Sequence, residues 1–76
     1  MPLVIVKMWA GRDEKLKSKL ADDLFQTMQD SMGAKPEGLS IAIHDIPKDE
    51  WDEKVKAVDM TPYEDDLYYL YGKKQH

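Results

Sequence analysis

The residue best suited to chemistry is a proline directly after the initiator methionine, in the opening stretch "MPLVIVKMW". A small second residue such as Pro2 permits removal of Met1, which exposes a secondary amine at the head of an apolar strand. An α-amino group titrates near neutral pH, and burial beside a cation disfavours its charged form. A buried prolyl nitrogen is then a neutral base able to take a proton. The alternative is that Pro2 follows Met1 by chance.

The other common catalytic sets lack parts in this chain. Cysteine is absent, which excludes a thiol nucleophile, a thiolate metal site and disulfides. There is no glycine-rich phosphate loop. The only histidines, His44 and His76, lie far apart. His44 is either a packed or interface residue or a general base. The carboxylates fall mainly on helix faces that we expect in solvent. We therefore expect neither a metal nor a cofactor.

Length and charge limit the class of protein. The 76 residues predict a single domain over 1–76. A domain this small is marginal alone and needs disulfides, a metal or partner subunits, which leaves self-association. A net charge of −4 without a basic stripe argues against nucleic acid as a partner. No segment resembles a signal peptide or a membrane span, so we expect a cytoplasmic protein.

Hydrophobic spacing predicts a strand, a helix and a second strand. Pro2–Trp9 is rich in Val and Ile and apolar on both faces, which is typical of a strand covered on both sides. Asp13–Met32 has apolar residues at helical spacing, with Asp13 as its amino-terminal cap and Gly33 as its stop. Leu39–Ile46 alternates as a second strand. A helix between two strands predicts an α/β (α+β) fold built on one β-α-β unit with parallel strands.

Two short helices are expected after the second strand. Trp51, Val55 and Val58 share one face of an amphipathic helix. A third helix runs from Thr61, as its cap, to Gly72, followed by a frayed "KKQH" tail. The tyrosine-rich "LYYLYG" is either dimer packing or a lid. Acid and base residues four apart are expected to pair on the exposed helix faces: Asp13 with Lys17, Glu50 with Lys54, and Asp52 with Lys56.

A sheet of two strands is not stable alone. Its outer edges are unpaired and its second face is apolar, and another copy of the chain would cover both. The pattern therefore predicts a homo-oligomer.

The chain resembles the 4-oxalocrotonate tautomerase family. The resemblance rests on "PLVIVKMWAGRDEKLKSKL" followed by "MGAKPEGLSIAIHDIPKDEW", and it covers roughly residues 2–58. Its specific parts are the proline after methionine, the Gly-Arg pair after the first strand, and the order of helix, strand and aromatic residue. The "SIAIHDIPKDEW" stretch and the longer carboxy-terminal end look most like the dimeric, phenylpyruvate-tautomerase-like branch.

The resemblance implies a role for five residues. Pro2, once Met1 is removed, corresponds to the catalytic amino-terminal proline, and Arg12 to an arginine that binds a substrate carboxylate. Trp51, together with Leu3, would form the apolar wall of the pocket. Ser40 stands where the best-known members carry a second arginine. A hydroxyl there brings no charge, which favours an enol with one carboxylate over a dicarboxylate.

The resemblance thus implies cofactor-independent keto–enol tautomerisation of a small 2-oxo acid, with Pro2 as general base. Ser40 or a backbone N–H would stabilise the enolate oxygen. A dimer is favoured and a hexamer is possible. Two alternatives remain open: a hydratase or dehalogenase that acts on a short unsaturated acid, and a non-catalytic oligomeric scaffold.

Overall fold

A computed structural model describes all 76 residues, Met1–His76. The chain forms two compact units, Met1–Ile46 and Pro47–His76, and each is described by itself. None of the helices has both the length and the hydropathy that crossing a lipid bilayer requires. The single domain expected over residues 1–76 stays a prediction.

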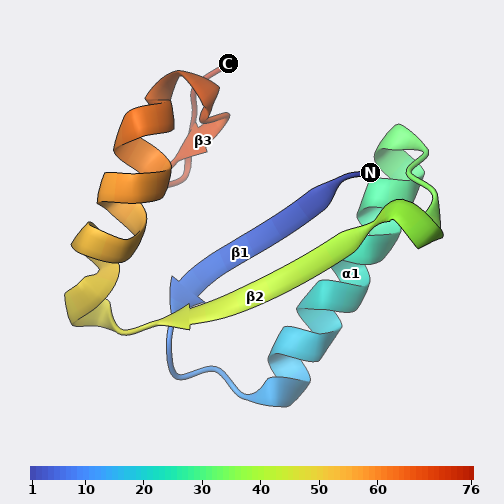
Figure 1. The fold of residues 1–76 in the computed structure, drawn as a ribbon, viewed down its shortest axis with the longest axis horizontal. Coiled ribbons are helices and arrows are strands. Elements are labelled where there is room, and N and C mark those ends of the chain that lie inside the picture. Colours follow the sequence, from blue (N-terminus) through green and yellow to red (C-terminus); the bar gives the residue numbers. More distant parts are fainter. The chain divides into compact units, whose positions relative to one another are not determined.

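The first unit is the predicted β-α-β unit (Figure 1). β1 and β2 pair in parallel, from Leu3 opposite Ser40 to Trp9 opposite Ile46, which confirms the predicted direction. Each strand begins one residue later than expected. The elements in chain order are β1 (Leu3–Trp9), α1 (Glu14–Met32), the 3₁₀ turn η1 (Pro36–Gly38) and β2 (Ser40–Ile46).

Both ends of α1 form as the sequence predicts. The Asp13 carboxylate accepts a hydrogen bond from the Leu16 backbone N–H at 2.8 Å, so it caps the amino end. Gly33 ends the helix with a left-handed φ of 68°, and its N–H donates to the Gln29 carbonyl at 2.9 Å. Before the helix, Gly11 has a φ of 123°, which favours glycine and lets the chain turn away from β1.

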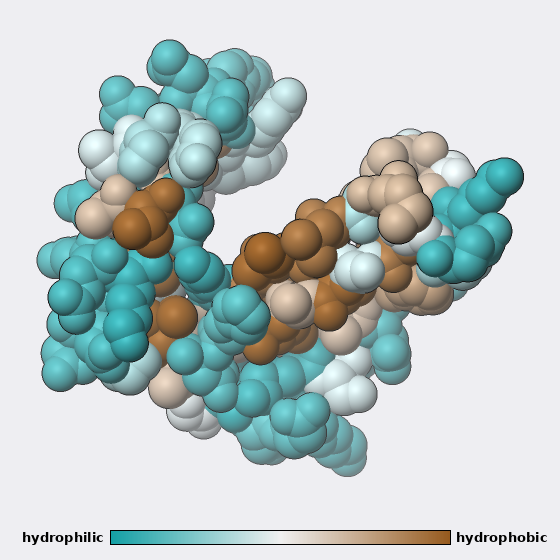
Figure 2. All heavy atoms as spheres, in the orientation of Figure 1, coloured by the Kyte–Doolittle hydropathy of each residue, from teal (hydrophilic) through white to brown (hydrophobic).

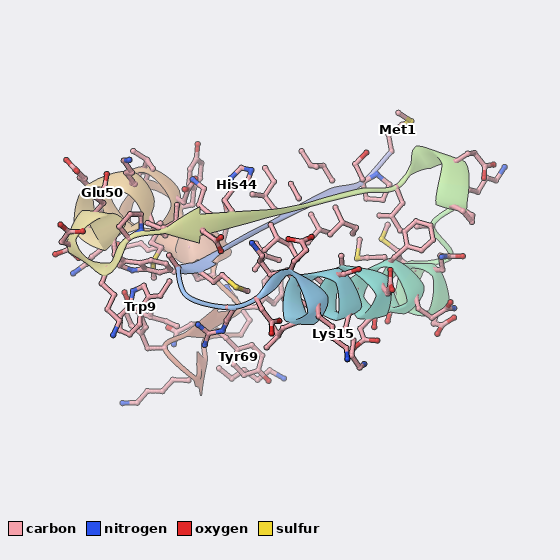
Figure 3. All side chains as sticks on the ribbon, turned by 90° about the horizontal axis from the view of Figure 1, so that it is seen from below. Met1, Trp9, Lys15, His44, Glu50 and Tyr69 are labelled. Carbon is pink, nitrogen blue, oxygen red and sulfur yellow. The ribbon has the colours of Figure 1, made fainter.

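The two faces of the β1–β2 sheet differ in what covers them. α1 lies along one face, as Figure 3 shows. On the other face Leu3 and Ile5 are 61% and 51% exposed, and His44 points away from α1. Figure 2 shows apolar side chains gathered along the strands on this uncovered side. We call it the open face. By strand alternation it carries Leu3, Ile5, Lys7 and Trp9 of β1 and Ser40, Ala42, His44 and Ile46 of β2, of which Ile46 is buried.

An ion pair ties α1 to β2. The Lys17 ammonium lies 2.9 Å from the Asp45 carboxylate and 3.7 Å from that of Glu14. The expected pair between Lys17 and Asp13 is therefore wrong, because the Asp13 carboxylate caps the helix instead. The hydrogen bond to Asp45 raises the pKa of Lys17 above its ordinary value.

The second unit consists of short helices and a hairpin. Glu50 and Lys54 form the predicted ion pair. The elements are the 3₁₀ turn η2 (Lys48–Glu50), the π-helix η3 (Asp52–Met60), the 3₁₀ helix η4 (Thr61–Asp66) and the antiparallel strands β3 (Tyr69–Leu70) and β4 (Lys73–Lys74).

The expected α-helix over 51–58 is wound as a π-helix, in which hydrogen bonds join residues five apart. Side chains four and five apart then share a face, so Val55 is buried and Met60 is half-buried. Val58 is 50% exposed. The prediction that Val58 shares a helix face with Trp51 and Val55 is therefore wrong, because it assumed α-helical spacing.

The expected helix from Thr61 to Gly72 ends early. Thr61 is itself helical, with φ −58° and ψ −46°, whereas a capping residue is extended, so no capping box forms. Tyr71 and Gly72 have positive φ values of 45° and 86°, the pattern of a tight hairpin turn, and they join β3 to β4. The tail is not frayed, because the Gln75 N–H donates to the Tyr68 carbonyl at 2.7 Å.

Asp45→Asn should lower the melting temperature at pH 7 by a few degrees, because it removes the carboxylate that holds Lys17. A lysine with a raised pKa contributes stability below its ordinary pKa and loses it as the pH rises through the raised value. The difference between wild type and variant should therefore shrink in strongly alkaline buffer. Circular dichroism melts across pH measure both effects.

Asp23→Asn is the matched control. It breaks the Lys19–Asp23 pair, which has the same 2.9 Å separation but side chains that are 77% and 63% exposed. Exposed pairs of this kind contribute little. Equal losses of melting temperature in the two variants would contradict the expectation that the Lys17–Asp45 pair stabilises the fold more than the exposed Lys19–Asp23 pair does.

Candidate active site

Pro2 is held at the start of the sheet by β2. Its carbonyl accepts a hydrogen bond from the Ser40 backbone N–H at 3.2 Å. Pro2 is half-buried and follows the fully exposed Met1. The strand register also sets Leu3 opposite Ser40. Parallel pairing thus brings together three of the predicted site residues, although Pro2 and Ser40 are 38 positions apart in the sequence.

The state of the Pro2 nitrogen depends on Met1. While Met1 is attached, this nitrogen belongs to a tertiary amide, which has no proton to give and no basic lone pair. Removal of Met1 converts it into a secondary amine at the same place. The site can therefore act as a base only in the chain that begins at Pro2.

Ser40 can offer its hydroxyl but not its backbone N–H. That N–H is engaged by the Pro2 carbonyl, and the N–H groups of Gly38 and Leu39 donate to Lys35 and Pro36. The backbone N–H groups of residues 38–40 are therefore engaged within the chain, and the expectation that Ser40 or a backbone N–H stabilises the enolate oxygen stays a prediction. The Ser40 side chain is exposed on the open face, beside Leu3. A hydroxyl in this place can donate one uncharged hydrogen bond.

Arg12 lies at the opposite end of β1 from Pro2. It follows Gly11 in the loop before α1, and its side chain is exposed. The seven residues of β1 separate the two positions by about 20 Å, at about 3.3 Å per residue. A single chain therefore does not bring the Pro2 nitrogen and its own Arg12 guanidinium to one small substrate.

Trp51 belongs to the second unit, between η2 and η3, and is half-buried. In its own unit it precedes the helix whose inner face carries the buried Val55. Its place in a pocket with Pro2 stays a prediction. His44, the other candidate base, is exposed near the middle of β2 on the open face, well away from the amino end.

Sequence reasoning missed one neighbour of the amino end. A Cβ atom placed on Gly38 would lie 3.6 Å from the Met1 sulfur and 3.8 Å from the Met1 Cα. No motif points to this glycine, and only the pairing of Pro2 with Ser40 brings it there. Its backbone therefore lines the space next to the Pro2 nitrogen.

Known proteins resemble the chain over most of its length. The family model described as "Tautomerase enzyme" matches residues 2–57, beginning at the proline. A "Probable tautomerase" of Xylella fastidiosa (strain 9a5c) is 40% identical over 60 residues, which is 79% of this chain and 73% of that protein. The 2-hydroxymuconate tautomerase of Comamonas testosteroni is 29% identical over 51 residues, which is 67% of this chain and 81% of that protein.

A solved structure agrees with these sequence relatives. It comes from a study of the 4-oxalocrotonate tautomerase isozymes of Methylibium petroleiphilum and superposes with a TM-score of 0.62 at 32% identity. The match covers 66% of this chain and 81% of that one. The predicted parallel β-α-β fold is thereby confirmed. The chain belongs to the 4-oxalocrotonate tautomerase family, and it is an isomerase with tautomerase activity.

Proposed function

We propose that the chain interconverts the keto and enol forms of a small 2-oxo acid, with the amine of Pro2 as general base after Met1 is removed. The observation that carries this proposal is the hydrogen bond from the Ser40 N–H to the Pro2 carbonyl, at 3.2 Å. It fixes the amino end against the sheet instead of leaving it to move in solvent. A base has to be positioned in this way to act on one carbon atom.

The reaction needs only a proton shift. In the direction of ketonisation, the enol O–H loses its proton as the C=C electron pair takes up a proton at C3. The C–O bond becomes C=O, and no electrons enter or leave. The neutral Pro2 amine takes the proton from the enol oxygen, and the ammonium group that results gives a proton to C3, so the amine ends in its starting state. General acid–base catalysis of this kind contributes about 10²–10⁴-fold to a rate.

Arg12 supports a site shared between copies of the chain. A guanidinium binds a carboxylate well because its fork donates two parallel hydrogen bonds. The Arg12 side chain is exposed but lies about 20 Å along β1 from Pro2 of the same chain. We therefore assign the carboxylate-binding arginine at each Pro2 to a neighbouring subunit.

The open face supports the same assembly. Leu3 and Ile5 are more than half exposed in the single chain, and only Ile46 and Val55 are buried apolar residues. Each strand of the β1–β2 sheet also has one unpaired edge. A second copy would cover this apolar face and supply Arg12. We favour a dimer over a hexamer because the carboxy-terminal extension adds surface that can cover the sheet in place of further copies. Its exposed tyrosines are Tyr63, Tyr68, Tyr69 and Tyr71.

The substrate we propose carries one carboxylate. Ser40 offers a hydroxyl to the enol oxygen and no positive charge, so it does not compensate a second carboxylate. Leu3, and Trp51 of the second unit, supply apolar wall. An apolar wall disfavours a charged amine and so keeps Pro2 neutral near pH 7. An aromatic 2-oxo acid such as phenylpyruvate fits these requirements.

Pro2→Ala should lower the rate of phenylenolpyruvate ketonisation about 10²–10⁴-fold, because a primary amine on a different carbon skeleton replaces the positioned base. The loss of enol absorbance measures the rate. Intact mass must show that Met1 is absent from both proteins. Full activity in the variant would overturn the proline-base mechanism.

The pH profile separates a base from an acid. A neutral Pro2 amine predicts that kcat/KM falls as the pH drops below the pKa of that amine, because protonation removes the lone pair. A hydratase or dehalogenase that needs the protonated amine should instead lose activity as the pH rises. A profile of the second kind would reject the tautomerase assignment of Pro2.

Mixing two variants tests the shared site. Arg12→Ala should lower kcat/KM about 10–100-fold, the effect of losing a charge-assisted pair. When Pro2→Ala and Arg12→Ala chains are unfolded together and refolded, a mixed dimer has one intact site. Random pairing then restores about a quarter of wild-type activity. No recovery, with mixed dimers demonstrated by native mass spectrometry, would show that both residues serve within one chain.

A further inference from the structure

The backbone at Gly38 does not itself require a glycine. Gly11, Gly33 and Gly72 have positive φ values, where a side chain is strained. Gly38 ends η1, and its φ lies outside that range. A residue with a side chain could adopt its conformation. The reason for a glycine must therefore lie in the space beside it.

That space adjoins the Pro2 nitrogen. A Cβ on Gly38 would meet Met1 alone, at 3.6 Å from its sulfur and 3.8 Å from its Cα. The Met1 Cα is two bonds from the Pro2 nitrogen, about 2.4 Å away by standard covalent geometry. A side chain at position 38 would therefore begin within about 6 Å of the Pro2 nitrogen.

The wall at Gly38 is fixed by its hydrogen bonds. The Gly38 N–H donates to the Lys35 carbonyl at 3.0 Å, and the Leu39 N–H donates to Pro36 at 3.2 Å. The next residue, Ser40, holds Pro2. These consecutive bonds set the separation between position 38 and the amino end, so an added side chain would project into the space that Met1 occupies.

Removal of Met1 leaves this space for the substrate. A carbon that exchanges a proton with the Pro2 nitrogen must lie about 3–3.5 Å from it. The Met1 Cα, about 2.4 Å from this nitrogen, lies on the same side of it and would be 3.8 Å from a Cβ at position 38. A substituent on the reacting carbon, C3 of the substrate, would therefore lie close to Gly38.

We infer that Gly38 is a specificity-determining residue: its missing side chain leaves room for a bulky group, such as an aryl ring, on C3 of the 2-oxo acid. The inference rests on the proposed function of Pro2. A methyl group at position 38 narrows the space slightly, because its contacts would be ordinary van der Waals distances. A branched side chain fills it and leaves a small unsubstituted acid able to react.

Exchange of the C3 protons tests whether the residue at position 38 determines which 2-oxo acid reacts. Processed wild type, Gly38→Ala and Gly38→Val are incubated with pyruvate or phenylpyruvate in D₂O, and NMR follows deuterium entering C3. Gly38→Val should lower the ratio of phenylpyruvate to pyruvate exchange by about 10-fold or more, which is the range for steric discrimination by one side chain. Gly38→Ala should fall between. Glu37→Ala, at an exposed neighbour in the same turn, should keep the wild-type ratio.

A second readout does not depend on turnover. Mass spectrometry compares alkylation of the Pro2 amine by 3-bromopyruvate and by 3-bromo-3-phenylpyruvate. Gly38→Val should slow the phenyl reagent selectively. If wild type exchanges neither acid but this selectivity appears, the tautomerase proposal fails and the role of Gly38 in shaping the space stands. If Gly38→Val changes neither ratio in a folded protein, as judged by circular dichroism, the inference about Gly38 is overturned.

Discussion

The parallel pairing of β1 with β2 is the interaction on which the site depends. Its register sets Leu3 opposite Ser40, and one further hydrogen bond continues the ladder to the Pro2 carbonyl. The amino end of the chain is thereby fixed beside Gly38 and Ser40, which come from a distant part of the sequence. The same pairing sends the other end of β1, and Arg12 with it, about 20 Å away. The same strand pairing thus brings Pro2, Leu3 and Ser40 together and keeps Arg12 of the same chain away from them.

A sheet of two strands explains why the missing half should come from another copy. α1 covers one face and is held there by the Lys17–Asp45 pair, while Leu3 and Ile5 on the open face stay exposed. Burial of apolar surface is the main force available to a chain without cysteine. In our account, the contact that stabilises the small domain also brings a cation to the Pro2 amine. Stability and catalysis would then depend on the same interface.

The first unit could be predicted from the sequence because its signals are local. Asp13 and Gly33 cap α1 as their residue types suggest. In β1 and β2, successive side chains point to opposite faces of the sheet, which assigns each residue to a face. The helices and hairpin of the second unit could not be predicted in the same way. The prediction for Val58 is wrong because it assumes α-helical winding where the chain forms a π-helix. The Tyr71–Gly72 turn lies within a run whose apolar residues have helical spacing, so the run resembles a helix. Positive φ at a tyrosine has no sequence signal as strong as that of a glycine.

The sequence predicts Pro2 as a site residue from its position after Met1, and it predicts Arg12, Ser40, Leu3 and Trp51 through the family resemblance. Sequence reasoning missed Gly38, because the nearness of this residue to the amino end arises from strand pairing and not from any motif. It also left the enolate donor open between Ser40 and a backbone N–H. The hydrogen bonds of 38–40 show that these three backbone N–H groups are already engaged, so a backbone donor would have to come from another part of the assembly.

The most direct test of the central claim is the titration of the Pro2 nitrogen itself, by ¹⁵N NMR of processed protein labelled at proline. Our account predicts that this amine has a pKa below that of free proline, low enough to leave it neutral near pH 7, and that the same pKa governs the acidic limb of kcat/KM. A nitrogen that stays protonated through neutral pH while the enzyme is active would contradict the account.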